Sequence, residues 1–271
     1  MLVEKLSMKH LVTLLLWGLS LSFGFSQTPN EYPDYTCAAN TLSMNHRLCM
    51  DMTEVSGLMY QTFLDDLKAE YGSKSKEFTS NLPDFRTWEK LFPGMTMDEI
   101  SRSFLEDESF ALMPAVGISY EQAQRFCDWR TAKFKEELSK MDPEERARFP
   151  KDFKFRLPTA KEWARIRFMQ QDKRMLKRIE KTSANNLKVY KIKKNKLLNN
   201  NLRISHIYQT QDPKLGMFNL FDNVAEMTSE KGVAMGGSWA LANEGNRFDR
   251  KFNYAVPESW LGFRCLFEII E

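Results

Sequence analysis

Apolar residues at helical spacing mark the first predicted helix of the chain. Ser56 precedes the run and is a residue type that caps helix N-termini, and Gly72 follows it as a usual C-terminal stop. The pattern therefore predicts an amphipathic helix over about residues 57–71. Its apolar positions are Leu58, Tyr60, Phe63, Leu64 and Leu67.

Three further helix starts carry the capping-box pattern, in which Ser or Thr is followed three residues later by Glu or Gln. The next helix after Ser119 places Cys127 on its apolar face, so we expect the Cys127 side chain to be buried. The three pairs are Thr96 with Glu99, Ser119 with Gln122, and Thr159 with Glu162.

Other apolar runs are short and broken by turn residues. The stretch from Gly216 to Thr228 breaks at Asp222–Asn223, and a further run ends at Gly236–Gly237, which predicts two short buried pieces held by turns. The paired glycines mark either a positive φ or a point where another backbone passes too close for a Cβ. A last apolar run, Trp260 to Phe267, predicts one compact strand. Few helices and short strands predict an α+β fold.

The N-terminus has the pattern of an export signal. Lys5 and Lys9 precede an apolar run over residues 11–25, and a small residue, Ser26, follows. The run is short for a membrane span, and no cysteine follows it directly to carry a lipid. We therefore expect residues 1–26 to be a signal peptide, the protein to be secreted or periplasmic, and the mature chain to have no membrane span.

The rest of the chain is long enough for one domain. We expect an N-terminal extension over 27–50 and a domain over 51–271, with a basic insertion at about 165–206. The chain has a net charge of only +3, but lysine and arginine dominate this insertion. Such a run is usually a solvated loop, and the functional alternative is contact with an acidic surface. The aromatic cluster at Phe85, Trp88 and Phe92 does not alternate with basic residues, which argues against nucleic-acid binding.

Four cysteines in an exported chain suggest two disulfides, with three connectivities open. Asn223 and Glu226 suggest a second feature. If the backbone curls there, their side-chain oxygens and backbone carbonyls such as that of Ala225 would converge on a Ca²⁺ ion. The alternative is structural: Asn223 caps a turn and Glu226 pairs with an arginine.

Several blocks resemble the formylglycine-generating enzyme (sulfatase-modifying factor) family. Gly216 to Met227 resembles its G-L-Y-D-x-x-G-N-V-W-E-W signature, although Ala225 and Met227 replace the tryptophans. The remaining matches are Asp51-Met-Thr-Glu-Val-Ser56, Pro114 to Trp129, Arg156-Leu-Pro-Thr159, Gly236-Gly-Ser-Trp239 and Leu261-Gly-Phe-Arg-Cys265.

The resemblance implies a single compact domain related to C-type lectins. It also implies a disulfide between Cys127 and Cys265, and by exclusion one between Cys37 and Cys49. Arg130-Thr131 and the charged stretch to Pro150 look more like the gliding-motility and type IX secretion lipoproteins of this superfamily. An envelope protein is the partner that this likeness suggests.

Catalysis in the family depends on two cysteines that bind copper, and here those positions are Leu241 and Asn246. Neither side chain ligates Cu(I), so no copper is predicted. Related oxygenases use three histidines, but only His46 and His206 follow the signal. No nucleophile elbow, P-loop, H-E-x-x-H or Rossmann motif is present. We therefore expect a non-catalytic protein for binding or assembly; the alternatives are an oxidoreductase with an altered active site and a calcium-dependent carbohydrate or ligand receptor.

Overall fold

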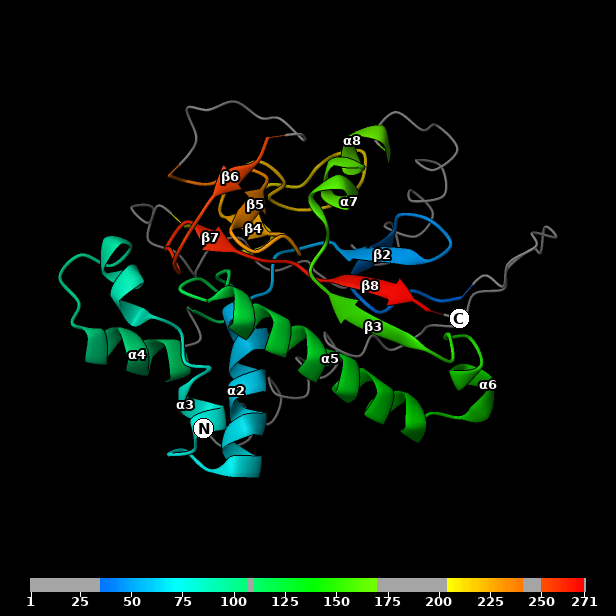
Figure 1. Ribbon diagram of the computed structural model, residues 1–271, viewed down its shortest axis with the longest axis horizontal. Helices are drawn as coiled ribbons and strands as arrows, with labels where there is room; N and C mark the ends of the chain where they lie inside the picture. The colour runs from blue at the N-terminus through cyan, green and yellow to red at the C-terminus, as the bar shows by residue number, and fades with distance from the viewer. Residues whose placement is uncertain (1–34, 107–109, 170–203, 241–249, 271) are drawn as a thin grey trace.

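The computed structural model describes residues 35–106, 110–169, 204–240 and 250–270 (Figure 1). The predicted signal peptide, most of the basic insertion, and positions 241 and 246 lie outside these ranges.

In the residues that the structure describes, the strands form two four-stranded sheets. The first has the order β1-β2-β8-β3 and is antiparallel throughout. It consists of β1 (Thr41–Ser43), β2 (Leu48–Asp51), β8 (Leu266–Ile269) and β3 (Phe153–Arg156). The second has the order β6-β5-β4-β7, in which β4 and β7 run parallel. Its strands are β6 (Phe252–Asn253), β5 (Val233–Met235), β4 (Ala225–Met227) and β7 (Leu261–Gly262).

The C-terminal apolar run differs from its prediction as one strand. It divides into β7 in the second sheet and β8 in the first, with Phe263–Cys265 between them. The linking residues are held by other partners, because the Phe263 carbonyl accepts the N–H of Val55 and the Cys265 carbonyl accepts the N–H of Asp51. The run therefore passes from one sheet to the other and ties them together.

The main helices begin where their caps predict. Ser56 accepts the N–H of Met59 at the start of α2 (Gly57–Tyr71), and Gly72 ends it at φ 89°. Capping boxes are present at α5 (Tyr120–Lys140) and α7 (Ala160–Ala164). The remaining helices are α3 (Lys76–Thr79), the 3₁₀ helix η1 (Phe85–Lys90), α4 (Met97–Glu106), α6 (Pro143–Arg146) and α8 (Ile166–Met169).

Helix α5 lies along the first sheet beside β3 (Figure 1). Phe134 on α5 meets the rings of Phe153, Phe155 and Phe267 edge-on. Burial of such rings is a large source of stability, and their edge-to-face arrangement adds to it. The same face of α5 buries Cys127, as predicted.

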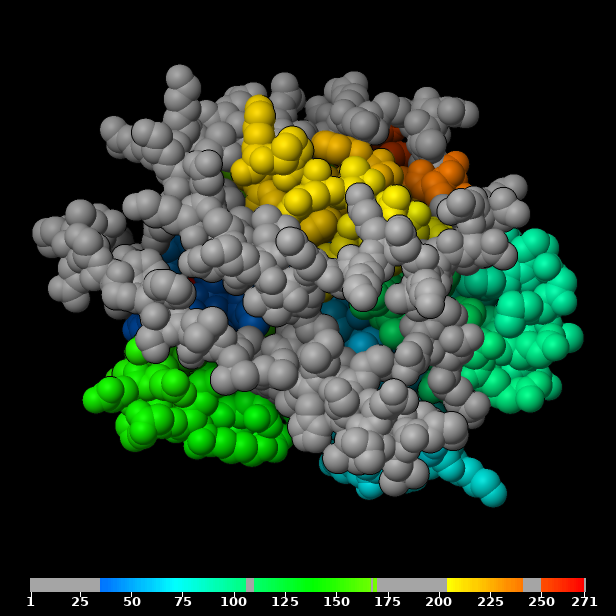
Figure 2. Space-filling view, turned by 180° about the vertical axis from the view of Figure 1, so that it is seen from behind, coloured from blue at the N-terminus to red at the C-terminus, as the bar shows by residue number. Residues whose placement is uncertain are grey.

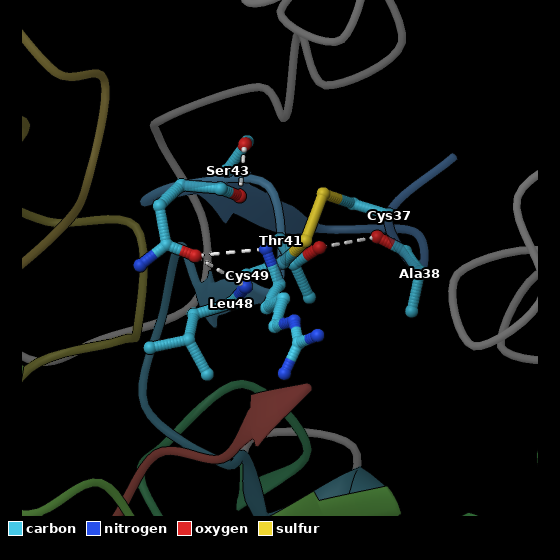
Figure 3. Close-up of a disulfide and its surroundings, with 8 residues drawn as sticks. Cys37, Ala38, Thr41, Ser43, Leu48 and Cys49 are labelled. Atoms are coloured by element: carbon cyan, nitrogen blue, oxygen red, sulfur yellow. Dashed lines mark hydrogen bonds between the residues drawn. A yellow bond between two sulfur atoms is a disulfide. The ribbon is translucent and has the colours of Figure 1, made fainter. Parts of the chain in front are cut away.

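The N-terminal strands belong to the same sheet as the C-terminal one. The predicted boundary between residues 50 and 51 falls inside β2, which pairs with both β1 and β8. A disulfide joins Cys37 to Cys49 on β2, which confirms that predicted pair (Figure 3). Among the described helices, none combines the length and apolar character that crossing a bilayer requires.

Candidate functional site

In the central stretch, the backbone of residues 221–227 lies between two other runs, residues 236–239 and strand β7. The amide of Trp239 donates to the carbonyl of Asn223, and an added Cβ on Gly237 would lie 1.9 Å from the carbonyl oxygen of Phe221. Gly236 has φ 90°. Both interpretations of the glycine pair are therefore confirmed, one at each residue. On the other side, β4 pairs with β7. Figure 2 views the molecule from behind, where residues 204–220 appear in yellow.

Glu226 on β4 is the centre of a buried ion pair. Its carboxylate accepts both Nε and Nη2 of Arg264, and Trp163 Nε1 donates to Glu226 Oε2 at 2.7 Å. The guanidinium also donates to the carbonyls of Asp51 at 2.9 Å and Phe218 at 3.0 Å. Burial is the largest single influence and lowers the pKa of Arg264, but the charge and hydrogen bond of Glu226, together with the charges of Glu54 and Asp51, outweigh it and the pKa is raised. The predicted alternative of an arginine partner for Glu226 is confirmed.

Asn223 and Asn219 form a matched pair around one carboxyl group. Both have left-handed backbones, at φ 59° and 53°. Their amides donate to Glu54, from Asn223 to Oε1 at 3.1 Å and from Asn219 to Oε2 at 3.0 Å. Their Oδ1 atoms accept the N–H groups of Ser205 at 2.8 Å and Thr210 at 2.9 Å. The two side chains thus hold the segment from Ser205 to Thr210 against the core.

The Glu54 carboxyl is fully buried, and burial is the main reason that its pKa rises to about 8. The charge of Arg264 opposes the rise, whereas that of Glu226 adds to it. The amide donors from Asn219 favour the ionised form and oppose it further. The raised pKa brings ionisation of the buried Glu54 carboxyl close to neutral pH.

A second buried charge pair lies beside the sulfurs of Cys127 and Cys265. Arg130 Nη1 and Nη2 donate to Asp51 at 2.7 and 3.0 Å, and the amide of Cys265 donates to Asp51 Oδ2 at 2.9 Å. The two sulfurs lie 3.5 Å apart. Both cysteines are thiols, so the predicted disulfide is corrected to a buried thiol pair. A disulfide requires about 2.05 Å between its sulfurs.

The side chains of the predicted calcium ligands Asn223 and Glu226 already have other partners. Glu226 already holds Arg264 and Trp163, and the Asn223 oxygen already accepts from Ser205. These side-chain oxygens therefore do not fit a Ca²⁺ ion, which takes six to eight oxygen ligands. The positively charged Arg264 guanidinium also lies beside them. Among the described residues, no group of three or more His, Cys, Asp or Glu side chains comes together for a metal. Calcium binding stays a prediction.

Unused hydrogen-bonding capacity gathers around Trp239. The buried Oγ atoms of Ser238 and Ser259 and Oδ1 of Asp222 lack a hydrogen-bond partner within the described ranges. Ser238 precedes Trp239, whose Nε1 donates to the Ser259 carbonyl at 3.2 Å. Buried hydroxyls of this kind are ordinarily satisfied by internal water. Ser238 and Trp239 come just before residues 241–249 in the chain, and that segment includes the two positions of the family's copper cysteines.

Sequence reasoning did not assign roles to Glu54, Asp51, Arg130, Asn219 or Arg264. A signal was available, since Asp51, Glu54 and Arg264 all lie inside blocks that carry the family resemblance. Their partners are distant in sequence, however, and neither periodicity nor composition identifies such pairs.

The fold and this central cluster define the class of protein: an α+β domain whose signature stretch is fastened by buried ion pairs. The family model for the sulfatase-modifying factor enzyme 1-like domain matches residues 14–269, and the chain belongs to that family. No curated protein matched the sequence.

Two solved structures are similar at low identity. Variable protein 1 of Treponema denticola is 16% identical, with 89% of this chain and 90% of that chain covered and a TM-score of 0.40. CarF is 14% identical, with 83% and 87% covered and a TM-score of 0.41.

Proposed function

We propose that the protein is an exported, non-catalytic member of this family that acts in binding or assembly in the cell envelope. The observation that carries the proposal is the state of its cysteines. The chain has four, and all lie within the described ranges. Cys37 and Cys49 are bonded to each other, and Cys127 and Cys265 are buried at 2% and 0% exposure.

Copper chemistry needs accessible thiolates, because Cu(I) is a soft ion. The two positions that carry them in the family are Leu241 and Asn246 here. The buried pair is a poor substitute. A hydrogen bond to Cys265 and burial both raise the pKa of Cys127, which keeps this sulfur protonated.

The proposal of export is supported by the N-terminal sequence and by the Cys37–Cys49 disulfide. The N-terminal pattern predicts a signal peptide, and a Cys37–Cys49 disulfide is typical of oxidising compartments. Association with gliding or type IX secretion components is the finer part of the proposal. It is supported by the Arg130-Thr131 resemblance, although both residues also have structural roles: Arg130 binds Asp51, and Thr131 Oγ1 accepts the N–H of Phe155.

We propose that the basic insertion is a surface through which the protein contacts acidic material in the envelope. Its lysines and arginines suit an acidic protein, polysaccharide or membrane surface. Because contacts between exposed charges are screened by salt, envelope material held through this segment elutes at moderately raised ionic strength.

The decisive experiment is an oxidase assay on a cysteine-containing sulfatase peptide, together with Cu(I) titration. We expect no aldehyde product and no tight copper binding from the natural chain. The double variant Leu241→Cys/Asn246→Cys restores both thiols and is the positive control, with one Cu(I) bound per chain. Turnover by the natural chain would overturn the proposal.

Affinity purification from envelope extracts then tests the binding role. Co-purification of secretion or motility components supports it. Retention on a glycan array that depends on calcium would instead favour the receptor alternative.

A further inference from the structure

Helices α7 and α8 form one short helical run with two unlike faces (Figure 1). Helical hydrogen bonds continue across their junction, from the amide of Arg165 to the Lys161 carbonyl at 3.1 Å and from the amide of Met169 to the Arg165 carbonyl at 3.2 Å. Residues four positions apart therefore lie on the same face. The inward face is buried against an apolar cluster and consists of Ala160, Trp163, Ile166 and Met169.

The outward face carries Lys161, Arg165 and Phe168, and we call these three side chains the α7–α8 face. All three are exposed, and Phe168 at 67% has the highest value among the exposed large hydrophobic residues of the described ranges. The acidic side chain of the run does not neutralise these cations, because both oxygens of Glu162 accept from Arg156. The face therefore combines two cations with one uncovered phenyl ring.

This combination fits a lipid surface better than a protein surface. A stable interface between proteins buries roughly 800 Å² on each partner and has an apolar core of several side chains. The α7–α8 face offers only one apolar side chain. At a bilayer, one aromatic ring can enter the headgroup region while neighbouring cations contact the lipid phosphates.

We propose that the α7–α8 face is a docking surface for an anionic phospholipid bilayer. Phe168 enters the boundary between headgroups and acyl chains, and Lys161 and Arg165 contact lipid phosphates. The chain passes from α8 directly into the basic insertion, whose lysines and arginines add attraction at longer range. The inference rests on the proposed contact with acidic envelope material, and it identifies that material as lipid.

The first experiment measures co-sedimentation with vesicles of phosphatidylglycerol at low ionic strength. The chain without the predicted signal peptide is used, because the apolar run of residues 11–25 would itself bind lipid. We expect binding that is lost on vesicles of phosphatidylcholine and in raised salt. Phe168→Ala should weaken it about tenfold, and Lys161→Gln/Arg165→Gln about 25-fold.

Matched controls remove the same chemistry from other parts of the surface. Val256→Ala shortens an apolar side chain that is 57% exposed, and Lys68→Gln/Lys76→Gln removes two exposed charges from α2 and α3. We expect each control to change vesicle binding by less than about twofold. Circular dichroism confirms that all variants are folded.

The second experiment places a reporter at the position of the ring. We expect phosphatidylglycerol with brominated acyl chains to quench the added fluorescence of Phe168→Trp but not that of Val256→Trp. Quenching of both or of neither would overturn the inference, because Phe168 would then not be the residue that enters the bilayer.

Two further outcomes separate this inference from the proposed function. If the natural chain and the α7–α8 variants bind phosphatidylglycerol vesicles equally, the inference is overturned, whereas contact through the basic insertion stands. If soluble polyglutamate binds the natural chain as strongly as the vesicles do and Phe168→Ala weakens both equally, the face fits an acidic protein instead of a bilayer. That result also overturns the inference but agrees with a protein partner in the envelope.

Discussion

Each buried charge in the core has its own set of partners. Asp51 is paired with Arg130, and Glu226 is paired with Arg264, all at less than 10% exposure. A buried ion pair is weak as a source of stability, but removing one partner leaves the other charge unpaired in a low-dielectric interior. Replacing one residue of either pair should therefore lower the stability of the fold, because its partner would remain as an unpaired buried charge.

Glu226→Gln tests this directly. The variant keeps the size of the side chain but leaves the Arg264 guanidinium without its counter-ion, so we expect the free energy of unfolding to fall by about 3–5 kcal/mol. Urea denaturation measures it. Glu136→Gln is the matched control at an exposed pair with Lys140, with an expected change of about 0–1 kcal/mol.

The stability of Glu226→Gln in calcium and in chelator shows whether Glu226 acts as the partner of Arg264 or as a calcium ligand. With the arginine as the partner of Glu226, the loss in Glu226→Gln is the same in calcium and in chelator. If chelator lowers the melting temperature of the natural chain but not of the variant, Glu226 binds calcium and the ion-pair interpretation is incomplete.

Glu54 gives the protein a pH dependence of stability. Its pKa rises from 4.5 to about 8 on folding, mainly through burial, so the folded state holds a proton that the unfolded state has lost. Stability from this group is therefore complete below pH 4.5 and is lost as pH rises toward 8, by roughly 5 kcal/mol at most. Glu54→Gln cannot ionise and should flatten this slope in urea titrations between pH 5 and 9. An identical slope in the variant would assign the pH dependence to another group.

At the scale of elements, the helix starts were predictable because each capping box forms between residues three positions apart. Thr159 and Glu162, for example, satisfy each other whatever the rest of the chain does. The split between β7 and β8 was not predictable, since it depends on amides contributed by Val55 and Asp51. For the same reason, periodicity alone could not pair Glu226 with Arg264 or Glu54 with Asn219. The proximity of Cys127 and Cys265 was available from the family resemblance.

Glycine substitutions test the close packing of the central runs. A Cβ at Gly237 would lie 1.9 Å from the carbonyl oxygen of Phe221, and neither atom can rotate away, because the Cβ is fixed to its Cα and the oxygen belongs to the backbone. We expect Gly237→Ala to cost about 3 kcal/mol or more. Gly94→Ala is the control: it has φ 97° but no atom near the added Cβ, so it should cost only about 1–2 kcal/mol. Equal losses in thermal unfolding would show that the runs can separate.

At the scale of the whole molecule, the fold joins its two ends in one sheet. Strand β2 lies next to β8 near the C-terminus, and the interior between the sheet and α5 is packed with aromatic rings. Two hydrogen bonds also join these distant parts of the chain, since Arg264 Nη1 donates to the Asp51 carbonyl and the amide of Cys265 donates to the Asp51 carboxylate. Loss of β1 and β2 would therefore leave β8 as an exposed edge strand. Attachment of these two strands thus contributes to the stability of the whole domain.

The Cys37–Cys49 disulfide is the covalent part of that attachment. It closes a loop of sequence separation 12 that includes β1, which restricts the unfolded chain. In the chain-entropy account, removing such a bond costs about 3 kcal/mol. We expect Cys37→Ser/Cys49→Ser to lower the free energy of unfolding by about that amount in urea, measured without reductant. Reductant should lower the stability of the natural chain equally and leave the double variant unchanged. If the variant unfolds at the same urea concentration as the natural chain, β1 and β2 are held by strand pairing alone.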